Sequence, residues 1–269
     1  MNPTLSSLVY RATWPFVHRY KGAKGHYPRV PQPSGTRLHD RMQIGNYAKL
    51  IPADEAPEVL VSQGCNERAA ETVIGRYLDA AAEEGGSDNL VSFYLLGRFS
   101  LALAGTMCWA FDGFRELASW PVSRDLMNHP TDRGFAAFFH FPLPGSKFCT
   151  PGRRSYLLAE FWRRHRLPQS HYIGLPPANL ATALLFGNAA AAKELLPANR
   201  GWLETGEVLE LPEHGRVRMM LGEHDGEFDD NAGIYLGWHY DSEDLRGAGL
   251  RYGPPAVYPS GFRPFRRHS

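Results

Sequence analysis

The segment EHDGEFDDN, residues 223–231, gathers the side chains of this sequence that are best suited to bind a metal ion. Asp225, Asp230 and Asn231 offer carboxylate and amide oxygens, which are the ligands that Ca²⁺ prefers. An EF-hand loop starting at Asp225 would need glycine at its sixth position and glutamate at its twelfth. Those positions hold Asp230 and Leu236, so the sequence excludes an EF-hand.

The residues around this segment resemble a known family. RMMLGEHDGEFDDNAGIYLGW (residues 218–238) reads as strand, acidic turn and strand, and upstream WLETG (residues 202–206) leads into alternating residues. Residues 197–240 thereby resemble the final hairpin of the PA-IL-type calcium-dependent galactose-binding bacterial lectins. The resemblance implies that calcium binds to the protein and that sugar hydroxyls bind to the calcium. The implied calcium ligands are Asp225, Asp230 and Asn231, and the implied ligand-binding residues are Trp202, His224 and Phe228.

A turn without an ion is the alternative for the same segment. Asp, Asn and Gly form turns because their side chains bond to nearby backbone or because they tolerate positive φ. The sequence therefore predicts a hairpin here, and it leaves open whether the turn binds a cation.

A second candidate for chemistry is Cys65 in QGCNERAAETV, at the start of a predicted helix. A helix N-terminus favours the thiolate, which is the nucleophilic form of cysteine. His140, in FFHF, is the histidine that a predicted strand would hold in place, so it is the candidate base. A cysteine-dependent hydrolase or transferase is therefore an alternative function, and a small buried thiol is the plain alternative for Cys65.

Other motifs are missing from the sequence or incomplete. Neither HExxH nor a glycine-rich phosphate loop occurs. His239 and Asp241 have the spacing of an iron(II) oxygenase, but only His268 follows them, too near the end of the chain to complete that fold. The basic runs RRHR and FRPFRRHS are typical of solvated surfaces, so nucleic acid is not the expected partner.

The composition indicates a protein with a packed core and no strong overall electrostatic field. The 269 residues are 43% hydrophobic, and 29 Lys and Arg balance 28 Asp and Glu to a net charge of +1. Three cysteines without a CxxC motif favour a reducing compartment. The N-terminus lacks the pattern of a signal peptide. We therefore expect a soluble, cytoplasmic protein, with export by a signal-less route left open.

The longest apolar run, residues 91–111, predicts a buried helix. It is long enough to span a bilayer, but it contains Arg98, which would cost about 2.5 kcal/mol or more at mid-membrane. Gly97 and Gly105 fit helix packing in a protein core. The sequence therefore predicts no membrane span, and Asp88 is expected to cap this helix.

The remaining elements follow from hydrophobic periodicity. The 3.6-residue period predicts helices over residues 65–84 and 153–166, the latter with Tyr156, Leu157, Phe161 and Trp162 facing inward. GFAAFFHF predicts a short buried strand, and a period of two predicts strands after Trp202. The expected domain organisation is one compact unit. It comprises an irregular arm (1–57), a mainly helical body (58–196), a β-hairpin region (197–241) and a Gly/Pro/Arg-rich tail (242–269).

These predictions amount to an α+β protein, a helical body with a small antiparallel sheet late in the chain. The leading function is ligand binding through the acidic hairpin, with calcium as cofactor and a saccharide or another protein as partner. Catalysis at Cys65 and protein–protein interaction without catalysis stay open beside it.

Overall fold

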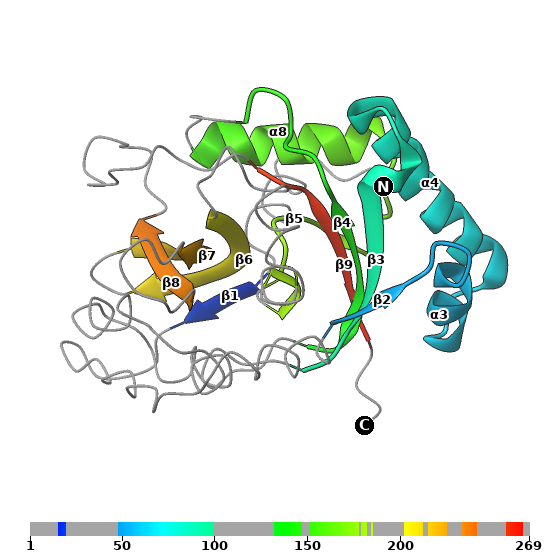
Figure 1. Ribbon diagram of the computed structural model, residues 1–269, viewed down its shortest axis with the longest axis horizontal. Helices are drawn as coiled ribbons and strands as arrows, with labels where there is room; N and C mark the ends of the chain where they lie inside the picture. The colour runs from blue at the N-terminus through cyan, green and yellow to red at the C-terminus, as the bar shows by residue number, and fades with distance from the viewer. Residues whose placement is uncertain are drawn as a thin grey trace.

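A computed structural model describes the protein. The described residues are 16–19, 48–98, 132–146, 151–177, 179–181, 184, 202–211, 215–224, 233–240 and 257–265. For strands 16–19, 215–224 and 233–240, and for most of 202–211, the description covers the backbone. Two β-sheets and three α-helices make up this part of the chain (Figure 1).

The helices lie in the first two thirds of the chain, and the last five elements in the described residues are all strands. The elements in chain order are β1 (Phe16–Arg19), β2 (Ala48–Ile51), α3 (Ala56–Ser62), α4 (Glu67–Gly85), the 3-10 helix η3 (Asp88–Leu90), β3 (Val91–Leu96), β4 (Gly134–Phe139), α8 (Pro151–Arg164), β5 (Tyr172–Gly174), β6 (Trp202–Leu211), β7 (Gly215–His224), β8 (Gly233–Tyr240) and β9 (Ser260–Pro264). One sheet has the order β2-β3-β4-β9-β5 and is antiparallel throughout. The other has the order β1-β6-β7-β8, in which only β1 and β6 are parallel. The α+β fold class is thereby confirmed.

Helix α4, at Glu67–Gly85, confirms the amphipathic helix predicted over residues 65–84. Asn66 caps it, since its Oδ1 accepts a hydrogen bond from the backbone N–H of Ala69 at 3.4 Å. Gly86 ends it in the left-handed conformation, with φ of 86°. Ala70, Ile74 and Tyr77 are buried at helical spacing and form the face that packs on the sheet.

The helix predicted over residues 91–111 is wrong where the structure describes it, because residues 91–96 form strand β3. Val91 and Phe93 are buried on one face, whereas Ser92 and Tyr94 alternate with them on the other. Ser87, rather than Asp88, caps the turn that leads into this strand. A short apolar run fits a buried strand as well as a buried helix, so periodicity alone could not decide.

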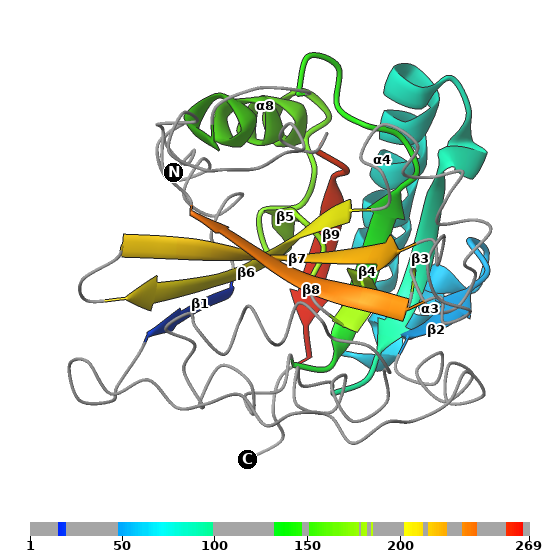
Figure 2. The same cartoon turned by 60° about the vertical axis from the view of Figure 1, so that its left-hand side comes forward.

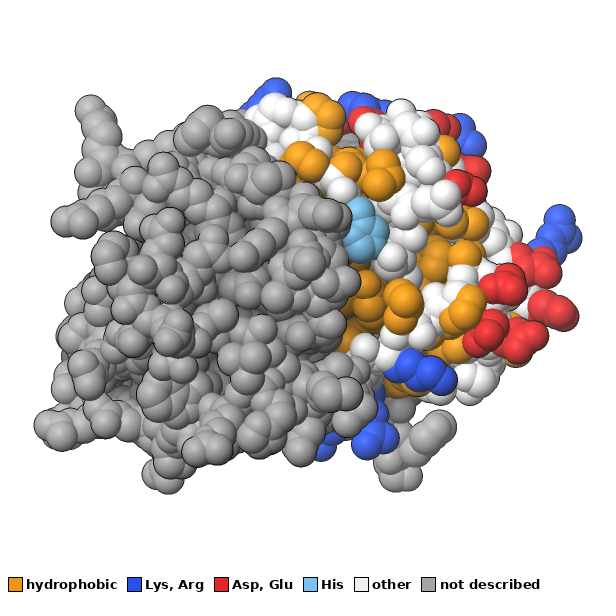
Figure 3. Space-filling view, viewed as in Figure 1, with side chains coloured by type: hydrophobic (Ala, Val, Ile, Leu, Met, Phe, Trp, Pro, Cys, Tyr) orange, Lys and Arg blue, Asp and Glu red, His pale blue; other side chains and the backbone are white. Residues whose placement is uncertain are grey.

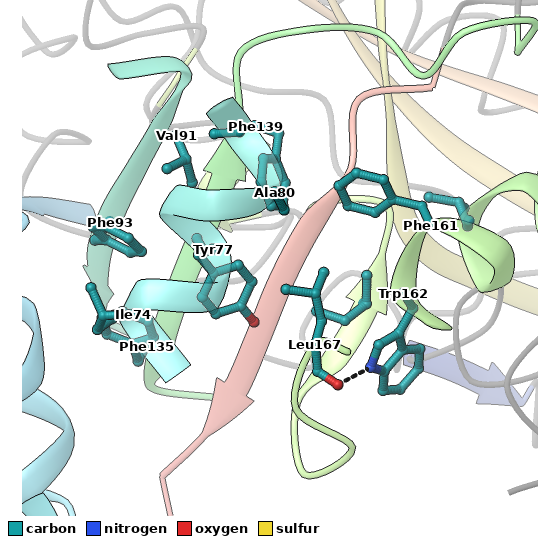
Figure 4. Close-up of a cluster of buried hydrophobic side chains, with 14 of the residues drawn as sticks. Ile74, Tyr77, Ala80, Val91, Phe93, Phe135, Phe139, Phe161, Trp162 and Leu167 are labelled. Atoms are coloured by element: carbon teal, nitrogen blue, oxygen red, sulfur yellow. Dashed lines mark hydrogen bonds between the residues drawn. The ribbon is translucent and has the colours of Figure 1, made fainter. Parts of the chain in front are cut away.

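Helices α4 and α8 cover one face of the five-stranded sheet. The hydrophobic core lies between these helices and the sheet. Tyr77 of α4 packs against Phe93 and Phe139, with ring centroids 6.2 and 5.9 Å away. Phe161 of α8 meets Phe139 edge to face at 5.1 Å. Figure 4 shows these rings converging from the two helices and the strands. The opposite face of this sheet looks toward the second sheet (Figure 2).

Helix α8 confirms the predicted helix, with part of its predicted face corrected. Phe161 and Trp162 are buried, and the Trp162 indole donates a hydrogen bond to the Leu167 carbonyl at 2.8 Å. Tyr156, predicted to face inward, is 39% exposed. Leu158 and Ala159 are buried instead, because the helix face is rotated from the predicted one.

Paired charges join the end of α8 to the end of α4. The imidazole of His165 lies between Glu83, with Nδ1 to Oε2 at 3.2 Å, and Glu84, with Nε2 to Oε1 at 3.0 Å. Arg164 contacts the same Glu84 oxygen at 2.5 Å. Because Glu84 is partly buried and Glu83 is exposed, Glu84 makes the stronger of the two helix–helix contacts.

The strands are distributed more widely than the sequence predicts. Where the structure describes region 58–196, it contains β3, β4 and β5 as well as α4, α8 and most of α3. The predicted tail contains β9, which lies between β4 and β5 inside the larger sheet. None of the helices in the described part of the chain combines the length and apolarity needed to cross a bilayer.

Candidate functional site

Two of the three predicted ligand-binding residues, Trp202 and His224, lie at one end of the four-stranded sheet. Strands β7 and β8 pair without interruption as far as His224 opposite Gly233. Trp202, the first residue of β6, pairs with Gly222 of β7. Diagonal neighbours two residues away across a strand pair lie about 7–8 Å apart, which is the expected separation of Trp202 and His224. The backbone thus brings these two residues to the same sheet end.

The acidic residues of the prediction lie in the connection between β7 and β8. Asp225, Phe228, Asp230 and Asn231 all fall in residues 225–232, outside the described residues. The residues on either side of that connection lie opposite each other, because His224 of β7 pairs in register with Gly233 of β8. Among the residues that the structure does describe, no three His, Cys, Asp or Glu side chains form a group that could hold a metal ion.

The Thr205–Gly206 dipeptide of the WLETG motif forms an irregularity in β6. The β6–β7 register shifts between Glu204 and Val208. At this point the Thr205 hydroxyl accepts a hydrogen bond from the Glu207 N–H at 3.2 Å, and the Gly206 N–H donates to Pro176 O at 2.8 Å. The motif therefore bends β6 and attaches it to the segment after β5.

Cys65 and His140 are not brought together. Cys65 lies just before the cap of α4, and its Sγ contacts Nη1 of Arg263 in β9. Arg263 is opposite Phe135 of β4, and His140 follows five residues later. Five residues at about 3.4 Å each span about 17 Å. Arg263 is a cation and cannot accept the Cys65 proton, so the described residues around Cys65 do not form the predicted nucleophile–base pair.

His140 has a different hydroxyl partner, Ser92 of β3. Its Nε2 lies 2.6 Å from Ser92 Oγ, and both side chains are half-buried on the sheet face away from the helices. Burial lowers the pKa of His140 below its ordinary value, so the ring is neutral near pH 7 and can accept the Ser92 proton. Phe138 lies against the His140 ring, edge to face at 5.3 Å.

Tyr94 lies on the same face of β3 as Ser92. Burial raises the pKa of its phenol, and hydrogen bonding with Ser92 lowers it by a smaller amount. The phenol therefore stays protonated at neutral pH and can donate a hydrogen bond. The sequence does not single out Ser92 and Tyr94, because its periodicity predicts a helix where residues 91–96 form a strand. Read as a strand, their alternation would have placed both on one sheet face.

A third polar group lies inside the helix-covered core. The Tyr77 hydroxyl and His171 Nδ1 are 3.0 Å apart, and both side chains are fully buried. His171 Nε2 has no hydrogen-bond partner among the described residues. Burial lowers the pKa of His171 to about 4. This pair is closed off by Phe93, Phe135 and Phe139, so it belongs to the core.

The described part of the molecule therefore offers two places for chemistry. One is the end of the four-stranded sheet that carries the acidic connection, and the other is the Ser92–His140 pair on the larger sheet. Comparison with known proteins adds no family to these observations: no protein-family model, no curated protein and no solved structure matches the chain.

Proposed function

We propose that the chain is a ligand-binding protein that holds a calcium ion in the acidic segment 225–232 and binds a saccharide through that ion. The observation that supports this proposal is the register of β6, β7 and β8. Trp202 lies at the same sheet end as His224 and Gly233, the two described residues that flank the acidic segment. No other part of the described backbone brings as many of the predicted site residues together.

The chemistry of the segment suits calcium. Calcium takes six to eight oxygen ligands at about 2.3–2.6 Å, from carboxylates, amides and backbone carbonyls. Asp225, Asp230 and Asn231 supply side-chain oxygens within seven consecutive residues. A short connection between paired strands limits how far these oxygens can separate, which lowers the entropy cost of gathering them. Sugar hydroxyls can complete the coordination of such an ion.

The aromatic residues of the site give the saccharide an apolar contact. Ligand sites combine aromatic surface with a few polar groups that fix orientation. Trp202 and Phe228 are the aromatic candidates, and His224 adds a polar ring at the end of β7. A protein partner presenting acidic or hydroxyl groups to the same ion is the competing occupant.

A thermal melt of the full chain in EDTA and in millimolar calcium tests the proposal. At a calcium concentration one hundred times the dissociation constant, binding adds about 2.7 kcal/mol to the free energy of unfolding. We expect the melting temperature to rise by several degrees. The double variant Asp225→Ala/Asp230→Ala is expected to lose this rise.

The matched control is Glu213→Ala, which removes a carboxylate from the connection between β6 and β7. That connection follows Leu211 and precedes Gly215, at the opposite end of β7 from the acidic segment. The control should keep the full calcium-dependent rise. If calcium shifts no melt, or shifts the double variant as far as the wild type, the acidic segment is a turn without an ion.

A further inference from the structure

The larger sheet carries a side-chain arrangement that ligand binding at the acidic segment does not use. Ser92 on β3 and His140 after β4 face the same side, because Ser92 pairs with Phe138 and the His140 ring packs against Phe138. This side is away from α4 and α8. Figure 3 shows hydrophobic side chains reaching the surface apart from the acidic side chains over α3 and α4.

We propose that Ser92 is a nucleophile activated by His140 and that it accepts an acyl group from an uncharged carboxylic ester. The observation that supports this proposal is the distance of 2.6 Å between Ser92 Oγ and His140 Nε2. At that distance a base can take the proton of a hydroxyl group. Both side chains are half-buried, so they are held in place and still reachable. The proposal is independent of the calcium site.

The reaction balances with the groups present. Ser92 Oγ attacks the ester carbonyl carbon while its proton passes to His140 Nε2. The bond to the leaving alcohol then breaks, and the imidazolium returns the proton to the departing oxygen, leaving an acyl ester on Ser92. Water, deprotonated by the same ring, attacks that ester, and the products are a carboxylic acid and free Ser92.

The surroundings favour an uncharged substrate. Phe138 is buried beside the pair, and Tyr258 stacks on Phe138 with ring centroids 6.3 Å apart. Tyr94 and Tyr258 are the described titratable groups next to the pair, and burial raises the pKa of Tyr94 and raises that of Tyr258 to about 12. Both phenols are therefore neutral near pH 7. The Tyr94 phenol is a donor suited to the oxyanion that forms on the ester carbonyl.

The test uses the full chain with p-nitrophenyl acetate. We expect a burst of p-nitrophenolate and one acetyl group on the peptide that contains Ser92, located by mass spectrometry after an acid quench. Ser92→Ala should lose the burst and the label. The matched control Ser62→Ala removes an exposed hydroxyl that donates to the Val59 carbonyl and accepts from Gln63 Nε2, and it should keep both.

His140→Gln retains a polar side chain but cannot act as a base near neutral pH. It should slow the burst by about 100-fold or more, which is the usual contribution of general base catalysis. In the wild type, the burst rate should rise with pH to a plateau, with its midpoint below pH 6.5, because burial lowers the pKa of His140. This profile needs no variant, so it remains decisive if a substitution disturbs folding.

Two results would overturn the proposal. One is acetylation of lysine or cysteine with Ser92 unmodified. The other is a His140→Gln rate equal to that of the wild type. EDTA should leave the burst unchanged, so loss of the calcium site and loss of Ser92 reactivity are separate outcomes.

Discussion

At the scale of single residues, the buried Tyr77–His171 pair is expected to make the free energy of unfolding depend on pH. Whichever ring nitrogen of His171 carries the proton, one polar hydrogen or lone pair of the pair lacks a partner among the described residues. Desolvation disfavours the charged imidazolium and lowers the pKa of His171 to about 4. Folding therefore favours the neutral ring.

The first prediction concerns the pH dependence that follows from this pair. The unfolded chain binds the His171 proton near pH 6.5, and the folded chain binds it near pH 4. The folded pKa is the lower one, so this stabilisation is complete above pH 6.5 and is lost as the pH falls toward 4. At 1.36 kcal/mol per unit, the loss is roughly 3 kcal/mol.

Chemical denaturation between pH 4 and 7 measures this loss. His171→Leu removes the titrating ring and its unpaired nitrogen, so the variant should show a shallower fall in the free energy of unfolding than the wild type. His165→Leu, at the α4–α8 contact, is a control for replacing another buried histidine. Equal slopes for wild type and His171→Leu would show that His171 does not titrate in this range.

At the scale of elements, α4 approaches β9 closely only because β9 has glycine at position 261. A Cβ there would collide with the Tyr77 hydroxyl. Tyr77 cannot swing aside, because Phe93, Phe139 and His171 surround its ring. Helix and sheet would have to move apart instead.

The second prediction compares two glycine-to-alanine substitutions at this helix–sheet contact. Gly261→Ala should lower the free energy of unfolding by about 1–3 kcal/mol through overpacking. Gly75→Ala, in the interior of α4 with no atom near the added Cβ, should raise it by about 0.5–1 kcal/mol. Urea denaturation of both variants measures the two changes. Equal effects of the same sign would contradict the packing described for Gly261.

Elements with a strong local signal could be predicted from the sequence. Helix α4 has a capping Asn66, a stripe of apolar residues and a terminal Gly86, which all agree. The paired strands β7 and β8 follow from alternation and an intervening run of turn residues. Strand β3 could not be predicted, because its local sequence suits a helix equally well and only its pairing with β2 and β4 decides.

At the scale of the whole molecule, pairing between distant segments determines the larger sheet. Strand β9 lies between β4 and β5, although Ser260 follows Phe138, its pairing partner, by more than a hundred residues. No local pattern in the Gly/Pro/Arg-rich end of the chain marks it as part of a central sheet. The β4–β9 pairing separates Cys65, which contacts Arg263, from His140, and the β3–β4 pairing joins His140 to Ser92.

The two candidate sites differ in how much the sequence reveals. The acidic segment stands out because its residues are consecutive, and the sheet register then adds Trp202 and His224 at the same end. Ser92 and His140 are 48 residues apart and meet only through the β3–β4 pairing. Sites made by long-range pairing need the fold before they can be recognised.

The most direct test of the central claim is isothermal titration of calcium into the full, EDTA-washed chain. We expect the wild type to bind one calcium ion saturably. The double variant Asp225→Asn/Asp230→Asn should lose this binding, and Glu213→Gln should retain it. Galactose added afterward should bind to the calcium-loaded wild type and not to the EDTA-treated protein. Absence of saturable calcium binding, or equal binding by the double variant, would contradict the assignment of residues 225–232 as the site.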